Sequence, residues 1–119
     1  MNGTMTTENG RIIIENDVIA QYAGSSANEC FGIVGMATVS MKDGLVKLLK
    51  GDSVSKGVSV MVDENNALTI DIHIIVAYGV CISTVAENLM QTVRYKVEEY
   101  TGLKVDAIHV YVEGVRVID

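Results

Sequence analysis

Proline and tryptophan are absent from the 119 residues of this chain, and phenylalanine occurs once, at Phe31. The core must therefore be built from aliphatic side chains, and no row of aromatic rings is available for stacking nucleic acid bases. Basic residues are also few, because nine Lys and Arg stand against fifteen Asp and Glu, which gives a net charge of -6. Attraction to phosphate backbones and anionic lipid depends on clustered positive charge, so nucleic acid and bare membrane are poor partners.

The chain also lacks the segments that direct a protein out of the cytosol or into a bilayer. Its first residues, MNGTMTTENGR, contain neither the basic region nor the continuous apolar region of a secretion signal. The longest mostly apolar run, Ile74 to Ile82, is far short of the roughly 20 residues that span a bilayer. We therefore expect a cytoplasmic protein without direct membrane insertion, held peripherally at a membrane only through a partner.

Cysteine is limited to Cys30 and Cys81, which lack the spacing of a zinc site or a disulfide framework. We predict reduced thiols and no metal or other cofactor. Cys81 lies near a predicted helix start, where the helix dipole favours a reactive thiolate, but its apolar neighbours Val80 and Ile82 are more typical of a small buried residue. Cys30 is predicted to lie in the core.

The clearest pattern in the chain is a strand, a long helix and a second strand. Residues 68–80 alternate as a strand, with apolar side chains on one side and Thr69, Asp71 and His73 on the other. A final strand at 104–113 alternates in the same way and is followed by a short tail at 114–119. The helix between them carries one apolar stripe, formed by Ile82, Ala86, Leu89, Val93, Val97 and Tyr100.

Both ends of this helix carry sequence signals. Ser83 or Thr84 is placed to cap its start, and Glu87 would complete a capping box with Thr84. Gly102 supplies the C-terminal stop.

The first part of the chain predicts a flexible leader at 1–9, a short strand at 11–14 and a helix. This helix is expected to begin at Val18 after a cap at Asn16 or Asp17. Gly24 weakens the helix locally but permits close packing. A strand interrupted by glycines follows at 31–41.

Residues 42–56 are predicted as an exposed insertion with a short helix over 44–50. A strand at 58–62 follows, and the turn residues 63–66 predict a hairpin with the strand that begins at Leu68. The only positive stretch of the chain lies in the insertion, as a contact surface for an acidic partner or as a solvated helix face. Its lysines are Lys42, Lys47, Lys50 and Lys56.

These elements predict one domain over residues 1–119 with an α+β fold. We expect two layers, with a mixed β-sheet and two main helices packed on one face, in the order β-α-β-(short α)-β-β-α-β. Strands outnumber helices without strict alternation, which favours helices on one sheet face over a parallel βαβ fold.

One polar cluster stands out as a candidate site. Asp71, His73, His109 and Tyr111 would share the outward side of two strands if those strands lie in the same sheet. Such residues can bind a metal or transfer protons, but on a solvated sheet they more often form a polar surface. We therefore predict a contact surface, with no catalytic and no metal-binding residue.

The run Gly32-Ile33-Val34-Gly35 has the G-x-x-G form with which KH domains hold a nucleic acid backbone. A KH loop joins two helices and is basic, whereas this run leads into a strand and follows Glu29. It is better explained as a tight bend, and no nucleic acid partner is expected.

Several short landmarks recur in a fixed order between residues 10 and 115, and together they resemble the alkaline shock protein family of Gram-positive bacteria. This family is also described as a general stress or starvation protein family. The landmarks are Gly10-Arg11-Ile12, the Val18 to Ala23 helix, Gly32-Ile33-Val34-Gly35, Lys56-Gly57-Val58, Ile70-Asp71 through Tyr78-Gly79, and Thr101-Gly102-Leu103 before Val110-Tyr111-Val112.

The resemblance implies a small cytosolic protein that is not an enzyme and is linked to envelope stress. Some members are held at the membrane by an anchor protein, and short members are encoded beside a dihydroxyacetone-kinase-like, fatty-acid kinase protein. We therefore expect an interaction or scaffold protein whose partner is a membrane-anchor protein, the kinase-like neighbour or a second copy in a homo-oligomer. The alternative is an accessory or regulatory subunit of the kinase-like protein. The family has no catalytic motif, so no active-site residue is carried over.

Overall fold

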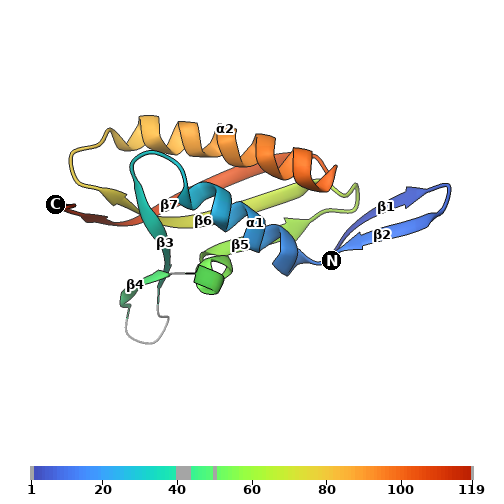
Figure 1. Ribbon diagram of the computed structural model, residues 1–119, viewed down its shortest axis with the longest axis horizontal. Helices are drawn as coiled ribbons and strands as arrows, with labels where there is room; N and C mark the ends of the chain where they lie inside the picture. Colours follow the sequence, from blue (N-terminus) through green and yellow to red (C-terminus); the bar gives the residue numbers. More distant parts are fainter. Residues whose placement is uncertain (1, 40–43, 50, 119) are drawn as a thin grey trace.

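The computed structural model describes residues 2–39, 44–49 and 51–118, which form a body of two helices and a five-stranded sheet with a two-stranded arm beside it (Figure 1). The elements in chain order are β1 (Gly3–Thr7), β2 (Gly10–Ile14), α1 (Asn16–Asn28), β3 (Ile33–Val39), β4 (Val46–Leu49), the 3-10 helix η1 (Gly51–Gly57), β5 (Val58–Val62), β6 (Leu68–Ala77), α2 (Ile82–Thr101) and β7 (Val105–Arg116).

Strand β6 lies at the centre of the sheet. It pairs in parallel with β7 along one edge, and antiparallel with β5 and β3 along the other. Strand β4 extends the sheet beyond β3, and β7 pairs with β6 alone among the described strands. The mixed α+β sheet predicted from the sequence is thus confirmed, with a parallel βαβ unit, β6-α2-β7, inside it.

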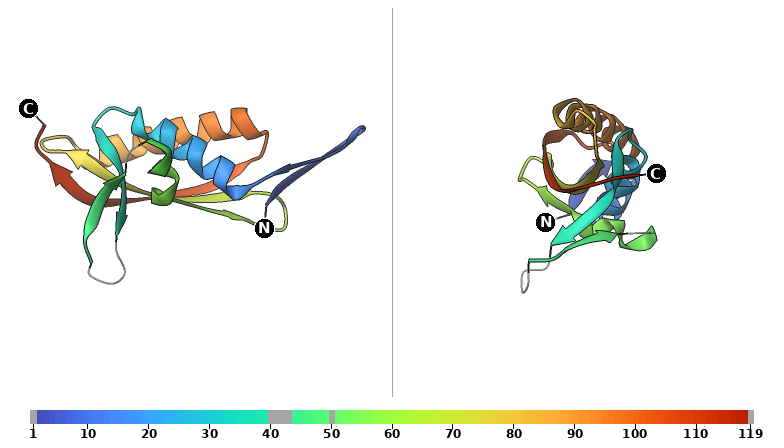
Figure 2. Two further views of the ribbon diagram at one scale, coloured as in Figure 1. Left: turned by 60° about the horizontal axis from the view of Figure 1, so that its bottom comes forward. Right: turned by 90° about the vertical axis from the view of Figure 1, so that its left-hand side faces the viewer.

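The core lies between the sheet and its two helices. Apolar side chains of β6 face this layer, and Leu68, Ile70 and Ile72 are completely buried. They share one hydrophobic cluster with Ile19 of α1 and Leu89 of α2, so both helices cover the same face (Figure 2). The opposite face of the β5-β6-β7 part of the sheet carries the polar residues of these strands.

The predicted flexible leader is wrong, because most of it forms strand β1. β1 pairs with β2 from Gly3–Ile14 to Thr7–Gly10, and the backbone N–H of Thr4 donates to Asn66 Oδ1 at 3.2 Å. Gly3 lies against Leu103, where an added Cβ would lie 2.3 Å from Leu103 Cδ1. Gly3 and Thr4 are therefore held at the base of the arm.

Helix α1 begins two residues earlier than predicted, and neither Asn16 nor Asp17 caps it. Glu15 is the N-cap residue and makes no side-chain cap hydrogen bond. Asn16 Nδ2 instead donates to the carbonyl of Val60 at 3.2 Å, which ties the start of the helix to β5. The side chain of Asn16, which the capping preference predicted as an N-cap, makes a tertiary hydrogen bond instead.

The short helix predicted over 44–50 is also wrong, because Val46–Leu49 is strand β4 and the helical turn comes later, in η1. The exposed insertion is corrected as well, since Leu49 and Val54 are buried in the core. η1 packs against α1 at Gly24, where an added Cβ would lie 3.1 Å from the carbonyl oxygen of Val54. The close packing expected at Gly24 is therefore confirmed.

The long helix has the predicted extent but a shifted buried face. Its buried residues are Val85, Leu89, Val93, Val97 and Thr101, whereas the predicted stripe members Ile82 and Tyr100 are exposed. Thr101 is tolerated in the core because its Oγ1 donates to the carbonyl of Val97 at 2.8 Å and accepts from the N–H of Leu103 at 3.1 Å. Gly102 ends the helix with φ of 76°, as predicted.

Strand β7 continues to Arg116, so the first residues of the predicted tail belong to the sheet. Its pairing with β6 shifts in register twice, once near Asp106 and once at Glu113. Each shift inserts one extra residue into β7, as in a β-bulge.

Candidate functional surface

The open face of the sheet brings together the four polar residues that the sequence pointed to. In the register of β6 and β7, Asp71 is the partner of His109 and His73 is the partner of Tyr111. Partners in a sheet project to the same face, so the four side chains form one surface. The juxtaposition that the sequence made conditional on a shared sheet is therefore present.

His73 is the best-fixed member of this surface. Its ring stacks on Tyr111, with ring centroids 4.7 Å apart and an interplanar angle of 13°. Its Nδ1 lies 2.6 Å from Glu113 Oε2, and both side chains are half-buried. A half-buried pair in this geometry holds the imidazole in one orientation, although its contribution to stability is only about 0–1 kcal/mol after solvent screening.

Glu113 is a surface member that the sequence analysis left out. The alternation that groups His109 with Tyr111 also reaches residue 113, so the signal was present. The β-bulge opposite Ile74 and Ile75 places Glu113 outside the regular register, where its carboxylate meets His73. Bulges commonly redirect a side chain in this way.

Asp71 lies between β5 and β7, with Ser59 as its partner on one side and His109 on the other. Its Oδ1 is shielded from solvent and accepts no hydrogen bond from the described residues. A shielded carboxylate oxygen is stabilised when a donor reaches it. Asp71 thus adds a half-buried carboxylate to this face.

Of the three lysines predicted as contact residues, only Lys47 lies among the described residues. Lys47 is exposed on β4, where alternation places it on the side of the buried Leu49 and not on the open face. Lys42 and Lys50 lie outside the described residues.

The comparisons with known proteins give a family for a chain with this fold and surface. Residues 4–117 match the alkaline shock protein 23 family, whose description is a cell envelope-related function. The chain belongs to this family. The match covers both sheets and both helices, and it confirms the resemblance seen in the sequence landmarks.

Relatives of this family member share nearly its whole length. The uncharacterized protein YloU of Bacillus subtilis is 46% identical over 118 residues, which are 98% of each chain. The uncharacterized protein Spy1614 of Streptococcus pyogenes serotype M6 is 37% identical over 119 residues, covering 99% of this chain and 98% of the relative. These names assign no catalytic activity. No solved structure gives a significant match.

Two further findings bear on what this family member can hold or cross. Within residues 2–39, 44–49 and 51–118, no three His, Cys, Asp or Glu side chains are grouped as a metal site. In the same part of the chain, no helix is long and apolar enough to cross a membrane.

The thiol of Cys81 has a lowered pKa. It is exposed at the N-cap of α2, contrary to the predicted burial, and its Sγ lies 3.4 Å from Ser83 Oγ and accepts a hydrogen bond from Thr84 Oγ1 at 3.3 Å. Hydrogen bonds from Ser83 and Thr84 lower the pKa of the Cys81 thiol from its ordinary value of 9.0 to about 7. The N-cap residue of α2 is therefore Cys81, which makes no side-chain cap hydrogen bond, and not Ser83 or Thr84 as predicted.

Cys30 provides an internal contrast. Its side chain is half-buried, and its Sγ donates to the carbonyl of Ser26 at 3.5 Å. Burial raises the pKa of the Cys30 thiol, so it carries less thiolate than Cys81 at any neutral pH.

We expect iodoacetamide to alkylate Cys81 first, with a rate that rises with pH to a midpoint of about 7, because only the thiolate reacts. Mass spectrometry of timed samples would measure both thiols. The double variant Ser83→Ala with Thr84→Ala removes the stabilising hydroxyls and should move the midpoint upward toward 9.0. An unchanged midpoint in that variant, or faster labelling of Cys30, would contradict this assignment.

Proposed function

We propose that this protein is a non-catalytic interaction protein in the cell envelope-related function of its family, and that the open face of its sheet binds another protein. The observation that carries the proposal is the face itself, because two helices cover one side of the sheet and leave the polar cluster uncovered on the other. Tyr111 and Met61 expose 44% and 58% of their surface there. Exposed tyrosine and methionine are characteristic of protein interfaces.

The charges of this face favour a partner that presents basic side chains. Asp71 holds an unsatisfied acceptor and Glu113 a carboxylate, within a chain of net charge -6. A Lys or Arg on the partner would be attracted by the negative charge of Asp71 and Glu113, while Tyr111 and Met61 supply apolar contact area. Complementary charge of this kind favours both encounter and correct orientation.

The shape of the molecule supports binding over catalysis. Two grooves in the described surface are lined by residues of α1 and α2, and the open-face cluster lines neither of them. His73 is held between Tyr111 and Glu113 on a strand, where a flat face suits a macromolecule better than a small substrate. We place the protein in the cytoplasm, peripheral to the membrane through such a partner.

The test is purification of the tagged protein at native expression, with identification of bound proteins by mass spectrometry. We expect the double variant His109→Ala with Tyr111→Ala to lose a partner that the wild type retains. The control, Asn88→Ala with Gln91→Ala, alters exposed residues of α2 and should keep it. Equal recovery by all three proteins would overturn the open face as the binding surface.

The identity of the recovered partner separates the two roles. A membrane-anchor protein fits the scaffold role. Stoichiometric recovery of a dihydroxyacetone-kinase-like protein would replace it with the role of an accessory subunit. Recovery of this chain alone would contradict binding to either the membrane-anchor protein or the kinase-like protein.

A further inference from the structure

The β1-β2 arm extends away from the body, in the direction opposite to α1 (Figures 1 and 2). With the arm included, the molecule measures 53 × 31 × 22 Å. The base of the arm contacts the body, where Gly3 and Met5 lie against Leu103 and Gly102 and the N–H of Thr4 donates to Asn66. From Thr6 to Ile13 the ribbon is exposed, apart from its pairing with itself.

This exposed ribbon carries apolar side chains that its own chain leaves uncovered. Ile12 and Ile13 expose 46% and 54% of their surface. An isolated two-stranded ribbon is marginally stable in water, because it has no apolar layer to pack on. Ile12 lies on the same face as Met5 and Ile14, whereas Ile13 lies on the opposite face, so a second surface that covers Ile13 would stabilise the ribbon from that side.

One face of the ribbon is directed away from its attachment to the body. The register pairs Thr4 with Ile13 and Thr6 with Arg11, so these four residues share a face. Met5 and Ile14, which contact the body, belong to the other face. Glu8 lies in the turn at the tip. The free face thus presents an apolar group, Ile13, next to a positive charge, Arg11.

A groove that matches the free face of the arm lies on the same chain, between the start of α1 and the end of α2. It is a groove of about 380 Å³ lined by Asp17, Val18, Gln21, Tyr22, Ser25 and Tyr100. Its floor is the stacked pair Tyr22 and Tyr100, whose ring centroids are 4.0 Å apart with an interplanar angle of 9°. Val18 and Tyr100 remain exposed beside it.

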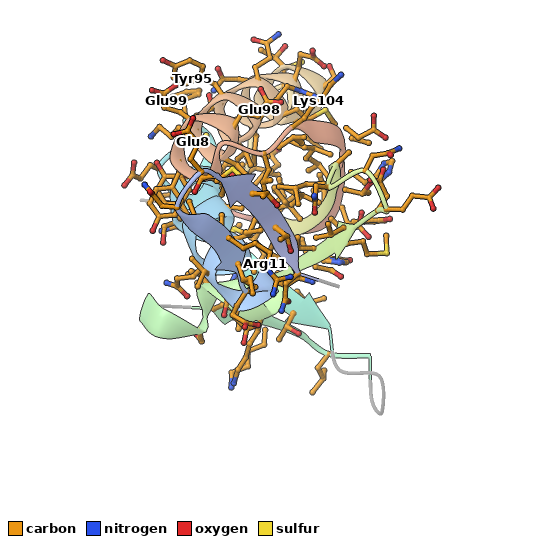
Figure 3. The ribbon with its side chains drawn as sticks, turned by 90° about the vertical axis from the view of Figure 1, so that its right-hand side faces the viewer. Glu8, Arg11, Tyr95, Glu98, Glu99 and Lys104 are labelled. Atoms are coloured by element: carbon orange, nitrogen blue, oxygen red, sulfur yellow. The ribbon has the colours of Figure 1, made fainter. Side chains whose placement is uncertain are left out.

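The groove and the free face are complementary in charge and in spacing. Arg11 and Asp17 are both exposed, and neither forms an ion pair with the described residues. Figure 3 shows Arg11 on the arm and the acidic Glu98 and Glu99 around the end of α2. Alternate strand residues are about 6.6 Å apart, and Asp17 and Tyr22, five residues apart on α1, are separated by about 7.5 Å along the helix axis. Ile13 on the tyrosine pair would therefore bring Arg11 close to Asp17.

We propose that two copies of this chain associate by exchanging arms, with Ile13 of each copy in the tyrosine groove of the other and Arg11 paired with Asp17 across the interface. A chain cannot fill its own groove, because its arm extends away from α1. The groove begins within a few residues of the arm base, so a two-fold axis between the bases satisfies both arms at once and closes the assembly. This surface is separate from the open sheet face and does not rest on the function proposed for it.

The interface is small, since each arm is a ribbon of five residue pairs, about 17 Å long. Interfaces below about 1,200 Å² in total are typical of weak complexes. We therefore expect a dissociation constant on the order of 10 µM or weaker. Sedimentation equilibrium over a concentration series that brackets this value would detect the dimer.

Charge reversal tests the pairing without touching the core, because both residues are exposed. We expect Arg11→Glu and Asp17→Arg each to weaken self-association about tenfold, and the double variant to restore it to within about threefold of the wild type. The control, Glu87→Arg, makes a matched reversal on an exposed residue of α2 and should leave the dimer unchanged. A wild type that stays monomeric, or a dimer that ignores Arg11→Glu, would overturn the proposal.

A cross-link gives a second, independent measurement. In a Cys81→Ser background, one sample carries Ile13→Cys and a differently tagged sample carries Tyr100→Cys. Mixing and mild oxidation should yield a disulfide-linked dimer containing both tags, since the proposal places these positions together. Formation of no mixed dimer above the level obtained with Tyr95→Cys, an exposed position of α2, would contradict the docking of Ile13.

Discussion

Replacing Ile72 by alanine should lower the free energy of unfolding by about 2–5 kcal/mol, the range typical for a large aliphatic residue removed from a packed core. Ile72 is completely buried on the central strand β6. Its sheet partners are Val58 on β5 and Val110 on β7, so three strands border the cavity that the substitution creates. A strand fixed on both edges cannot easily collapse into that space.

The measurement is urea unfolding followed by circular dichroism. Equal m-values, the slopes of unfolding free energy against urea concentration, would show that the variant and the wild type expose the same surface on unfolding. Met61→Ala is the matched control, because it truncates a side chain that is 58% exposed on neighbouring β5. Its effect should stay within about 0.5 kcal/mol. A loss below 1 kcal/mol for Ile72→Ala would show that the cluster is not packed as the structure has it.

Replacing Gly57 by alanine should destabilise the protein by about 1–3 kcal/mol, although it adds only one methyl group. An added Cβ would lie 2.7 Å from the carbonyl oxygen of Ala37 and 3.3 Å from its nitrogen. Both are backbone atoms of β3, so the clash cannot be relieved by rotating a side chain. Either β3 or the end of η1 must move.

Gly114→Ala is the matched control for this substitution. Its added Cβ would meet Ile75 Cγ1 at 3.9 Å, an ordinary van der Waals contact. We expect a change within about 0.5 kcal/mol by the same unfolding measurement. Equal effects of the two substitutions would indicate that the close approach of Gly57 to β3 is not the cause.

The parts of the fold that the sequence predicted are those in which local pattern and tertiary packing agree. Strand β6 alternates without interruption, and Gly102 takes the left-handed conformation that ends α2. The segment of β4 was wrongly predicted as a helix because the spacing of Leu45, Leu48 and Leu49 suits a helix as well as a strand. Only its pairing with β3 decides between the two. Strand β1 was not predicted because its threonines give no apolar alternation, and its position depends on pairing with β2.

The candidate surface was predictable to a similar depth. Alternation assigned His73 and His109 to one face each, but their proximity depends on β7 pairing in parallel with β6, which no local signal states. Lys47 was assigned to a short helix, whereas it lies on strand β4, whose pairing with β3 no local signal states. The tyrosine groove could not be predicted from the sequence, because the stacking of Tyr22 on Tyr100 joins two helices that are far apart in the chain.

The two register shifts in β7 have a consequence for how the protein behaves at high concentration. β7 is a twelve-residue edge strand, with one side unpaired among the described strands. Long, flat edge strands can pair with strands of further chains and start aggregates. The extra residues at Asp106 and Glu113 interrupt the pairing of β7, so its unbroken registers with β6 are limited to residues 107–112 and 114–116. The same bulge that brings Glu113 to His73 thus also breaks the regular strand edge on which a further chain would have to pair.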